Sequence, residues 1–176
     1  MTNEEKQMIQ ECRIMIVVKV TSSHIIKEEL DKLGFSDIAD VAISEIINAQ
    51  NTGIMIEYTG AGHSQSSDMS SIPVIYPFDF VDGAGAIVVF PEDERDWLGK
   101  QSMRQWAAEY MSGYCAFWNV EGCDWLHDAL PAIKENKTSE AAMKTAAYIC
   151  ARIAANIAVG RDVKRYPRFY LCRNLK

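Results

Sequence analysis

The sequence predicts an α+β fold, in which a predominantly helical domain carries a small antiparallel sheet of about three to four short strands. The best-marked helix covers residues 138–160, where Thr138 or Ser139 can cap the first turn and Gly160 can end the last one. The best-marked strands flank the turn signal at Asp82-Gly83, which predicts a hairpin near 73–90. Amphipathic and aromatic runs elsewhere in the chain favour helix.

Three helices are expected in the N-terminal third. Residues 4–20 begin amphipathic and continue into the β-branched run IMIVVKV, for which helix and buried strand are nearly equal alternatives, and we favour helix. Residues 22–34 and 35–50 follow as two shorter helices, the first ending at Gly34 and the second capped by Ser36. Their arrangement suggests a DNA-reading helix-turn-helix, but the second of them is acidic and has no Lys or Arg for phosphate. A plain helical hairpin is therefore expected.

The remaining elements follow from prolines, aromatic residues and small residues. Pro73 and Pro77 predict that the first hairpin strand lies at a sheet edge, because neither residue can donate a ladder hydrogen bond. After Pro91 the chain returns to helix, with aromatic residues every four positions. The terminal run RFYLC is β-prone and can add a strand. The aromatic ridge consists of Trp106, Tyr110, Tyr114 and Trp118.

The helix at 138–160 carries a stripe of small side chains that allows another backbone to approach closely. The aromatic ridge is expected to pack against this stripe as core; a stacking surface for a flat apolar ligand or for bases is the alternative. The functional interpretation is a homodimer contact, through either the stripe or the aromatic ridge. Its interface residues are predicted to be Ala146, Cys150, Ala154 and Ala158.

Length and composition indicate an ordinary globular protein. The 176 residues suit one domain, 1–176. The composition, with 48% hydrophobic and 24% charged residues, matches that of average soluble domains and indicates neither disorder nor a fibrous repeat. The five cysteines are odd in number and scattered, which predicts reduced thiols and a cytoplasmic location. The acidic start TNEEKQ does not resemble a signal peptide, and no apolar run reaches the roughly 20 residues of a membrane span, so no membrane partner is expected.

Charge is divided unevenly along the chain. The C-terminal segment 161–176 has six cations against Asp162 alone, a charge of +5, so the net charge of −6 leaves −11 on residues 1–160. Cations interleaved with aromatic rings can neutralise phosphates and stack on bases, which makes this segment a candidate nucleic-acid surface; a terminal strand or a contact with an acidic protein face is the alternative. The candidate residues are Lys164, Arg165, Tyr166, Arg168, Tyr170 and Arg173.

Catalytic motifs are weak. The Gly/Ser loop at 59–68 contains His63, the one low-priority catalytic candidate, but the loop matches neither the P-loop nor the dinucleotide fingerprint. Nearby carboxylates could converge on it, although their spacing does not require this. Cys123 and His127 form a single mixed pair, too few ligands for zinc, and no nucleophile signature surrounds Cys115 or Cys123. No metal or cofactor is predicted. The carboxylates are Glu57, Asp79, Asp82, Glu92 and Asp93.

Three functions remain, ranked by how well they fit these observations. The first is a small cytosolic protein-interaction or regulatory protein of the accessory or inhibitor type, which acts by surface binding as a homodimer. The second is a nucleic-acid-binding protein that uses segment 161–176. The third is a small hydrolase with its site at 59–68. A role without catalysis is favoured.

Overall fold

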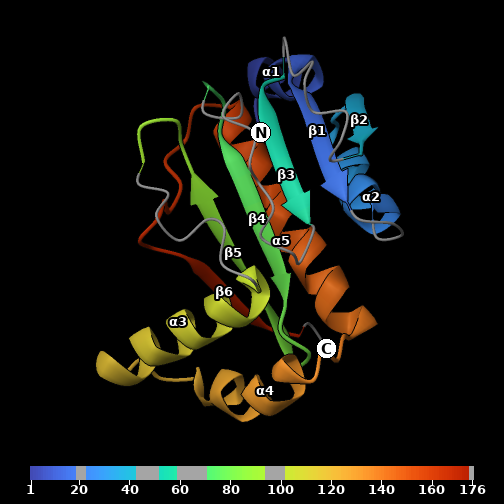
Figure 1. The fold of residues 1–176 in the computed structure, drawn as a ribbon. Coiled ribbons are helices and arrows are strands. Elements are labelled where there is room, and N and C mark those ends of the chain that lie inside the picture. Colours follow the sequence, from blue (N-terminus) through green and yellow to red (C-terminus); the bar gives the residue numbers. More distant parts are fainter. Residues whose placement is uncertain (19–22, 43–51, 59–70, 94–101, 175–176) are drawn as a thin grey trace.

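The computed structural model describes residues 1–18, 23–42, 52–58, 71–93 and 102–174, and within them it forms one six-stranded sheet with five helices (Figure 1). The helices begin and end close to local signals such as the Thr2 capping box, in which Thr2 and Glu5 cap each other's backbone N–H groups. In chain order the elements are α1 (Asn3–Glu11), β1 (Arg13–Val18), α2 (Ser23–Leu33), β2 (Asp37–Val41), β3 (Ile54–Tyr58), β4 (Val74–Asp79), β5 (Gly83–Val89), α3 (Met103–Phe117), α4 (Asp124–Lys134), α5 (Glu140–Ala158) and β6 (Tyr170–Arg173).

The sheet has the strand order β2-β1-β3-β4-β5-β6. Strands β2, β1, β3 and β4 are parallel, and β5 and β6 continue the sheet in antiparallel pairing. The β4–β5 pair, in which Val74 lies opposite Val89 and Asp79 opposite Ala84, is the hairpin expected near 73–90. The predicted fold class was wrong: the protein is α/β with a mixed, mostly parallel sheet, not a mainly helical domain with a small antiparallel one.

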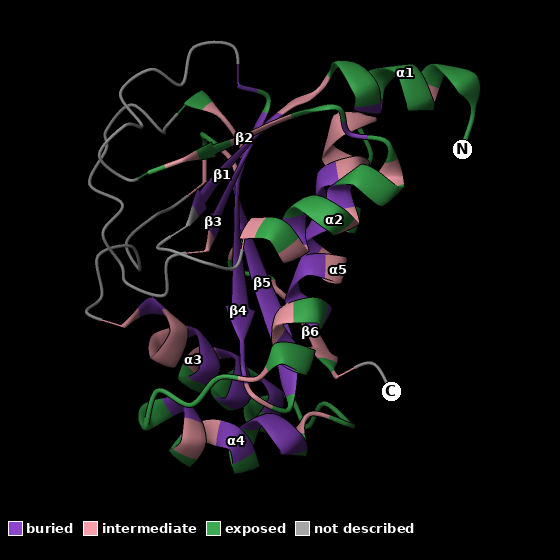
Figure 2. Cartoon of the chain, turned by 90° about the vertical axis from the view of Figure 1, so that its right-hand side faces the viewer, coloured by how far each residue is buried: buried purple, intermediate pink, exposed green. Residues whose placement is uncertain are grey.

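Helices cover both faces of the sheet. Figure 2, which views the sheet along its edge, shows α2 and α5 on one face and α3 on the other, with α4 beyond the end of the strands. Two apolar clusters correspond to these layers: one joins the sheet to α2 and α5, and the other joins it to α3 and α4. Alternate residues of each strand enter opposite clusters, as Ile14 and Met15 do in β1.

Strand β1 corrects the helix predicted for residues 4–20. The amphipathic part does form α1, but the chain becomes extended at Cys12, and Ile14, Met15, Ile16 and Val17 are all buried. A helix would present such a run to solvent on one side, whereas a parallel strand covered on both faces buries every side chain. The continuous apolar run was therefore a buried strand, stabilised by β2 and β3 on its two sides.

Strand β2 corrects the helix predicted for 35–50, since Asp37–Val41 pairs in parallel with β1. In DIADV the exposed residues Asp37 and Asp40 are three positions apart, with partly buried residues between them, so the pattern resembles a helix turn, and only the partner strand shows that the segment is a strand. Residues 43–51 lie outside the described residues. With a strand in this position, the helical hairpin and the helix-turn-helix alternative no longer apply.

The predicted edge position of β4 was also wrong, because β4 lies between β3 and β5. Its parallel ladder with β3 joins Met55 to Val74 and Ile56 to Ile75 and ends there. Pro77 comes two residues later, where β3 requires no backbone donor from it. Proline is therefore compatible with this inner strand.

Helix α5 agrees with its sequence signals and crosses the sheet. The Ser139 hydroxyl accepts a hydrogen bond from the Ala142 N–H, and Gly160 follows the helix with a φ of 71°. The helix packs on β4, β5 and α2 through buried small side chains. Beyond it, the terminal run forms β6 at the sheet edge beside β5. No described helix is both long and apolar enough to cross a membrane.

Gly83 at the start of β5 provides a test of this packing. A Cβ atom at Gly83 would lie 2.5 Å from the carbonyl oxygen of Cys172 in β6 and 2.7 Å from a ring carbon of Trp125 in α4. Both α4 and β6 therefore pack closely on the hairpin at this glycine. We expect Gly83→Ala to lower the free energy of unfolding by about 2 kcal/mol or more, through overpacking. Urea denaturation followed by circular dichroism measures this change.

Gly113→Ala is the matched control, because nothing lies within 4 Å of a Cβ atom at Gly113 in α3. Alanine there should raise the free energy of unfolding by about 0.5–1 kcal/mol through its helix propensity. Equal effects of the two substitutions would contradict the packing of Trp125 against the hairpin.

Candidate functional site

The carboxyl ends of the parallel strands are the first place to look for a site. In open α/β sheets ligands bind where the strand order reverses, and β1 lies between β2 and β3 at such a point. Glu57, near the end of β3, is buried on the same face as Met55. The following segment contains His63, and that candidate lies outside the described residues. Glu57 is thus the described carboxylate at this end of β3.

The carboxylates do not all converge. Asp79 lies at the end of β4, Asp82 is exposed in the hairpin turn, and Glu92 and Asp93 follow β5 at the opposite end of the sheet. Tyr58 shares the α5 side of the sheet with Asp79. Burial is the main cause that raises the pKa of Tyr58, and the negative charge of Asp79 adds to it.

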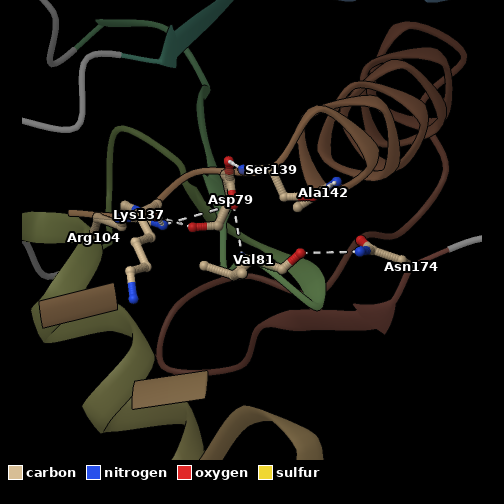
Figure 3. Close-up of polar contacts among 7 residues, drawn as sticks. All are labelled: Asp79, Val81, Arg104, Lys137, Ser139, Ala142 and Asn174. Carbon is tan, nitrogen blue, oxygen red and sulfur yellow. Dashed lines mark hydrogen bonds and ion pairs between the residues drawn. The ribbon is translucent and has the colours of Figure 1, made fainter. Parts of the chain in front are cut away.

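Asp79 is a buried carboxylate with several partners (Figure 3). One carboxylate oxygen accepts a hydrogen bond from the Val81 N–H at 2.7 Å, and the other accepts one from the Ser139 N–H at 2.9 Å. A guanidinium nitrogen of Arg104 lies 3.6 Å from the first oxygen, in an ion pair that is itself largely buried. Each charge is compensated, as a buried pair requires.

Arg104 extends the same cluster to two backbone carbonyls. Its Nε donates to the Asp79 carbonyl oxygen, and its Nη2 donates to the Lys137 carbonyl oxygen, just before α5. Asn174 donates to the Val81 carbonyl oxygen at 3.0 Å from the other end of the chain. The carboxylate and carbonyl oxygens of Asp79 therefore accept hydrogen bonds that join α3, β4 and the start of α5, which indicates a structural role.

The C-terminal segment contains a second ion-pair cluster, centred on Arg165. Its guanidinium binds Asp93 in a bidentate contact, with Nε donating at 3.0 Å, and lies 2.8 Å from Glu92. The same group lies over the Phe90 ring, 4.4 Å from its centroid. Hydrogen bonding to Asp93 is the main cause that raises the pKa of Arg165. This cation is already neutralised inside the chain.

The other residues predicted for nucleic-acid binding divide into two groups. Tyr166 and Tyr170 are half-buried; the Tyr166 ring lies beside Tyr110, and the Tyr170 hydroxyl accepts the Lys164 N–H at 2.8 Å. Lys164, Arg168 and Arg173 are exposed. The structure thus leaves three of the four predicted cations at the surface and turns both predicted tyrosines partly inward.

The predicted interface stripe is occupied within the chain. Ala146, Cys150 and Ala154 are buried and Ala158 is half-buried. Cys150, Ala154 and Ala158 belong to the apolar cluster that joins α5 to the strands. The aromatic ridge does not pack against this stripe, because α3 lies on the opposite face of the sheet. Strands β4 and β5 pack against α5, so this face of the helix is covered within the chain.

The aromatic ridge packs instead against the C-terminal segment. Trp106 and Tyr110 are stacked, with ring centroids 5.1 Å apart, and the Tyr110 hydroxyl donates to the Pro167 carbonyl oxygen at 2.8 Å. Phe169 meets both Tyr110 and Tyr114 edge to face. These contacts hold segment 161–176 along α3 and cover the first half of the ridge.

The far end of the ridge remains at the surface. Among the described residues, four large apolar side chains within a short stretch are strongly exposed: Tyr114 at 41%, Phe117 at 78%, Trp118 at 63% and Val120 at 41%. Phe117 and Trp118 contact each other edge to face, with centroids 5.1 Å apart. We call Tyr114, Phe117, Trp118 and Val120 the aromatic surface. Clustered exposed apolar side chains are more common at interaction sites than on the rest of a protein surface.

Two shallow cavities flank the aromatic surface. A cavity of about 270 Å³ is bounded by Tyr114, Val120 and the cations Lys164 and Arg168. A second cavity of about 410 Å³, which shares Val120, is bounded on its other side by Asp124, His127 and Asp128 of α4. The aromatic surface therefore has a basic flank and an acidic flank.

Cys115 and Cys123 line both cavities. Among the described residues no group of three or more His, Cys, Asp or Glu side chains is arranged to hold a metal ion. All five cysteines are thiols, so neither residue is in a disulfide.

Comparison with known proteins assigns no family. No model of a known protein family matches the chain, and no curated protein matches it. Among solved structures, a heterocyclase in complex with substrate and cofactor aligns with a TM-score of 0.49 and 11% sequence identity. The alignment covers 89% of this chain but 20% of the heterocyclase chain, so this chain spans about one fifth of that protein's length. Similarity at this level assigns no activity.

Removal of the Asp79 charge tests its structural role. Asp79→Asn would place an amide against the Val81 and Ser139 N–H donors and leave Arg104 without its buried partner. We expect the free energy of unfolding to fall by about 3–5 kcal/mol. The exposed neighbour supplies the control: Asp82→Asn should change stability by less than about 0.5 kcal/mol in the same urea titration. Comparable losses in the two variants would contradict the role assigned to Asp79.

Proposed function

We propose that the protein acts by surface binding, as an accessory or regulatory protein, and that its aromatic surface mediates self-association into a homodimer. The observation that carries this proposal is the exposure of Phe117 and Trp118 beside Tyr114 and Val120. Trp and Tyr are the residue types that most often dominate binding energy at protein interfaces. Burial of such rings on association offsets the loss of translational and side-chain entropy.

A second copy of the chain fits this surface because its flanks carry opposite charges. Lys164 and Arg168 lie on one side, and Asp124 and Asp128 lie on the other. A two-fold axis through the aromatic surface would place the basic flank of one copy against the acidic flank of its partner. The aromatic rings would form the apolar centre and the charges its polar rim, which is the usual anatomy of a protein interface.

The dimer has a direct test in sedimentation velocity across a concentration series. We expect the wild type to be dimeric at about 50 μM, and Trp118→Ala to raise the dissociation constant about 30-fold, the equivalent of a 2 kcal/mol hot spot. Met8→Ala serves as the control, because Met8 is an exposed apolar residue of α1, far from α3 (Figure 1). A monomeric wild type at this concentration would refute the homodimer.

Charge exchange tests the orientation of the two copies. Arg168→Glu and Asp128→Lys should each weaken the dimer, by placing like charges opposite each other. The double variant should recover most of the lost affinity, since each contact again joins opposite charges. Additive weakening in the double variant would show that the two flanks do not meet.

Nucleic-acid binding by segment 161–176 is the alternative proposal, and the geometry supports it less. Arg165 is paired with Asp93, and Tyr166 packs on Tyr110, so Lys164, Arg168 and Arg173 are the exposed cations among the residues predicted to bind nucleic acid. The residues outside this segment carry −11, which repels a polyanion. A hydrolase with His63 in its site stays a prediction, because His63 lies outside the described residues. The cytoplasmic location also stays a prediction.

Fluorescence anisotropy with labelled single-stranded and duplex DNA tests the alternative. We expect dissociation constants no tighter than about 10⁻⁴ M at physiological salt, the weak end of non-specific binding. The comparison uses a Lys164→Ala, Arg168→Ala variant, with Lys144→Ala as the charge-change control in α5. Micromolar binding that falls steeply with salt and disappears only in the double variant would overturn this expectation and favour the nucleic-acid role.

A further inference from the structure

The junction between α3 and α4 brings two cysteines together. Cys115 lies in the last turn of α3, and Cys123 directly precedes α4. The chain between them is tightly folded: the Val120 N–H donates to the Cys115 carbonyl oxygen at 2.9 Å, and Gly122 has a φ of 77°. Both cysteines line the same two cavities, and the proximity of Cys123 contributes to the raised pKa of Cys115.

We propose that Cys115 and Cys123 form a redox-active dithiol that a hydroperoxide oxidises to an intramolecular disulfide. Two observations support such a site: both cysteines line the same two cavities, and Cys123 is accessible from the surface. The oxidation needs neither a partner nor the aromatic side chains, but the cavities that hold the two cysteines also form the charged flanks of the proposed dimer interface.

The two cysteines differ in access, which sets their order of reaction. Cys123 is half-buried, whereas Cys115 is 6% exposed. Burial is the main cause that raises the pKa of Cys115 to about 12, and the contact with Cys123 adds to it. Cys115 therefore stays a thiol at neutral pH. Cys123 is the residue that attacks the oxidant, and Cys115 is the resolving residue.

The reaction proceeds in two balanced steps. The Cys123 thiolate attacks one oxygen of the hydroperoxide, the O–O bond breaks, and an alcohol or water leaves, so that Cys123 becomes a sulfenic acid. The Cys115 sulfur then attacks the sulfenic sulfur, an S–S bond forms, the S–O bond breaks, and the hydroxide leaves with the Cys115 proton as water. The two sulfurs together lose two electrons, and the hydroperoxide gains two.

Other cysteines provide internal references. Cys150 is buried in α5, and burial raises its pKa, so it should resist oxidation. Cys12 and Cys172 are half-buried and belong to other parts of the chain. Oxidation at the dithiol should therefore remove two of the five thiols and leave three.

Mass spectrometry of the whole protein tests the proposal. The chain is treated with a small excess of hydrogen peroxide, the remaining thiols are alkylated, and the protein is digested after Glu and after Lys or Arg. Glu121 lies between the two cysteines, so cleavage there leaves two peptides joined only by the disulfide. We expect the disulfide-linked peptides to be the main product, and we expect reduction with dithiothreitol to separate them into two free peptides.

Variants separate the pair from general thiol oxidation. Cys123→Ser should abolish the linked peptides and slow thiol loss at least about 10-fold, whereas Cys172→Ser should leave both unchanged. Because a polar substitution of buried Cys115 can disturb folding, Cys115→Ala is used there, with circular dichroism as the check. It should trap the Cys123 sulfenic acid, detectable with dimedone. Unlinked peptides in the wild type, or oxidation that favours Cys12 or Cys172, would overturn the proposal.

Discussion

The structure depends on one buried carboxylate. Asp79 ends the last parallel strand and binds the Ser139 N–H where α5 begins and the Arg104 guanidinium from α3. A lone buried charge would be strongly unfavourable, so each of these partners must be in place when the domain folds. Through this contact the helices on the two faces of the sheet are fixed to the same strand end. The hairpin turn follows from the same group, because Asp79 also accepts the Val81 N–H.

This constraint also determines where a binding surface can form. Because α5 is fixed over one face of the sheet, its small side chains pack against β4 and β5 and are not available to a partner. Helix α3, fixed on the other face, is covered along its first half by the C-terminal segment, through Tyr110, Phe169 and their contacts. Phe117 and Trp118 extend past the end of that cover. The proposed interaction surface is thus what remains of an aromatic ridge after the chain has covered the rest.

The C-terminal end of α3 also carries the proposed dithiol, so the aromatic surface and the redox site lie in the same small region. Cys115 and Cys123 enclose the segment that contains Phe117, Trp118 and Val120. Their sulfurs line the cavities on both flanks, while the aromatic rings project outward. The binding proposal depends on exposed rings, and the redox proposal depends on adjacent sulfurs. Each can therefore be true without the other.

The sequence by itself determined the features that depend on neighbours along the chain: the caps and length of α5, the start of α1, the hairpin of β4 and β5, and the terminal strand. It also identified the aromatic ridge and the basic segment as surfaces of interest. Tertiary structure decided between helix and strand where the local signals favour both equally. The run Ile14 to Val17 became a strand because β2 and β3 flank it, and Asp37–Val41 became a strand because β1 pairs with it. The pairing of Arg165 with Asp93, the meeting of Cys115 with Cys123, and the exposure of Trp118 all depend on contacts between segments that spacing along the chain does not specify. Local propensity acts over a few residues, whereas the burial that selects one fold is a property of the whole packed chain.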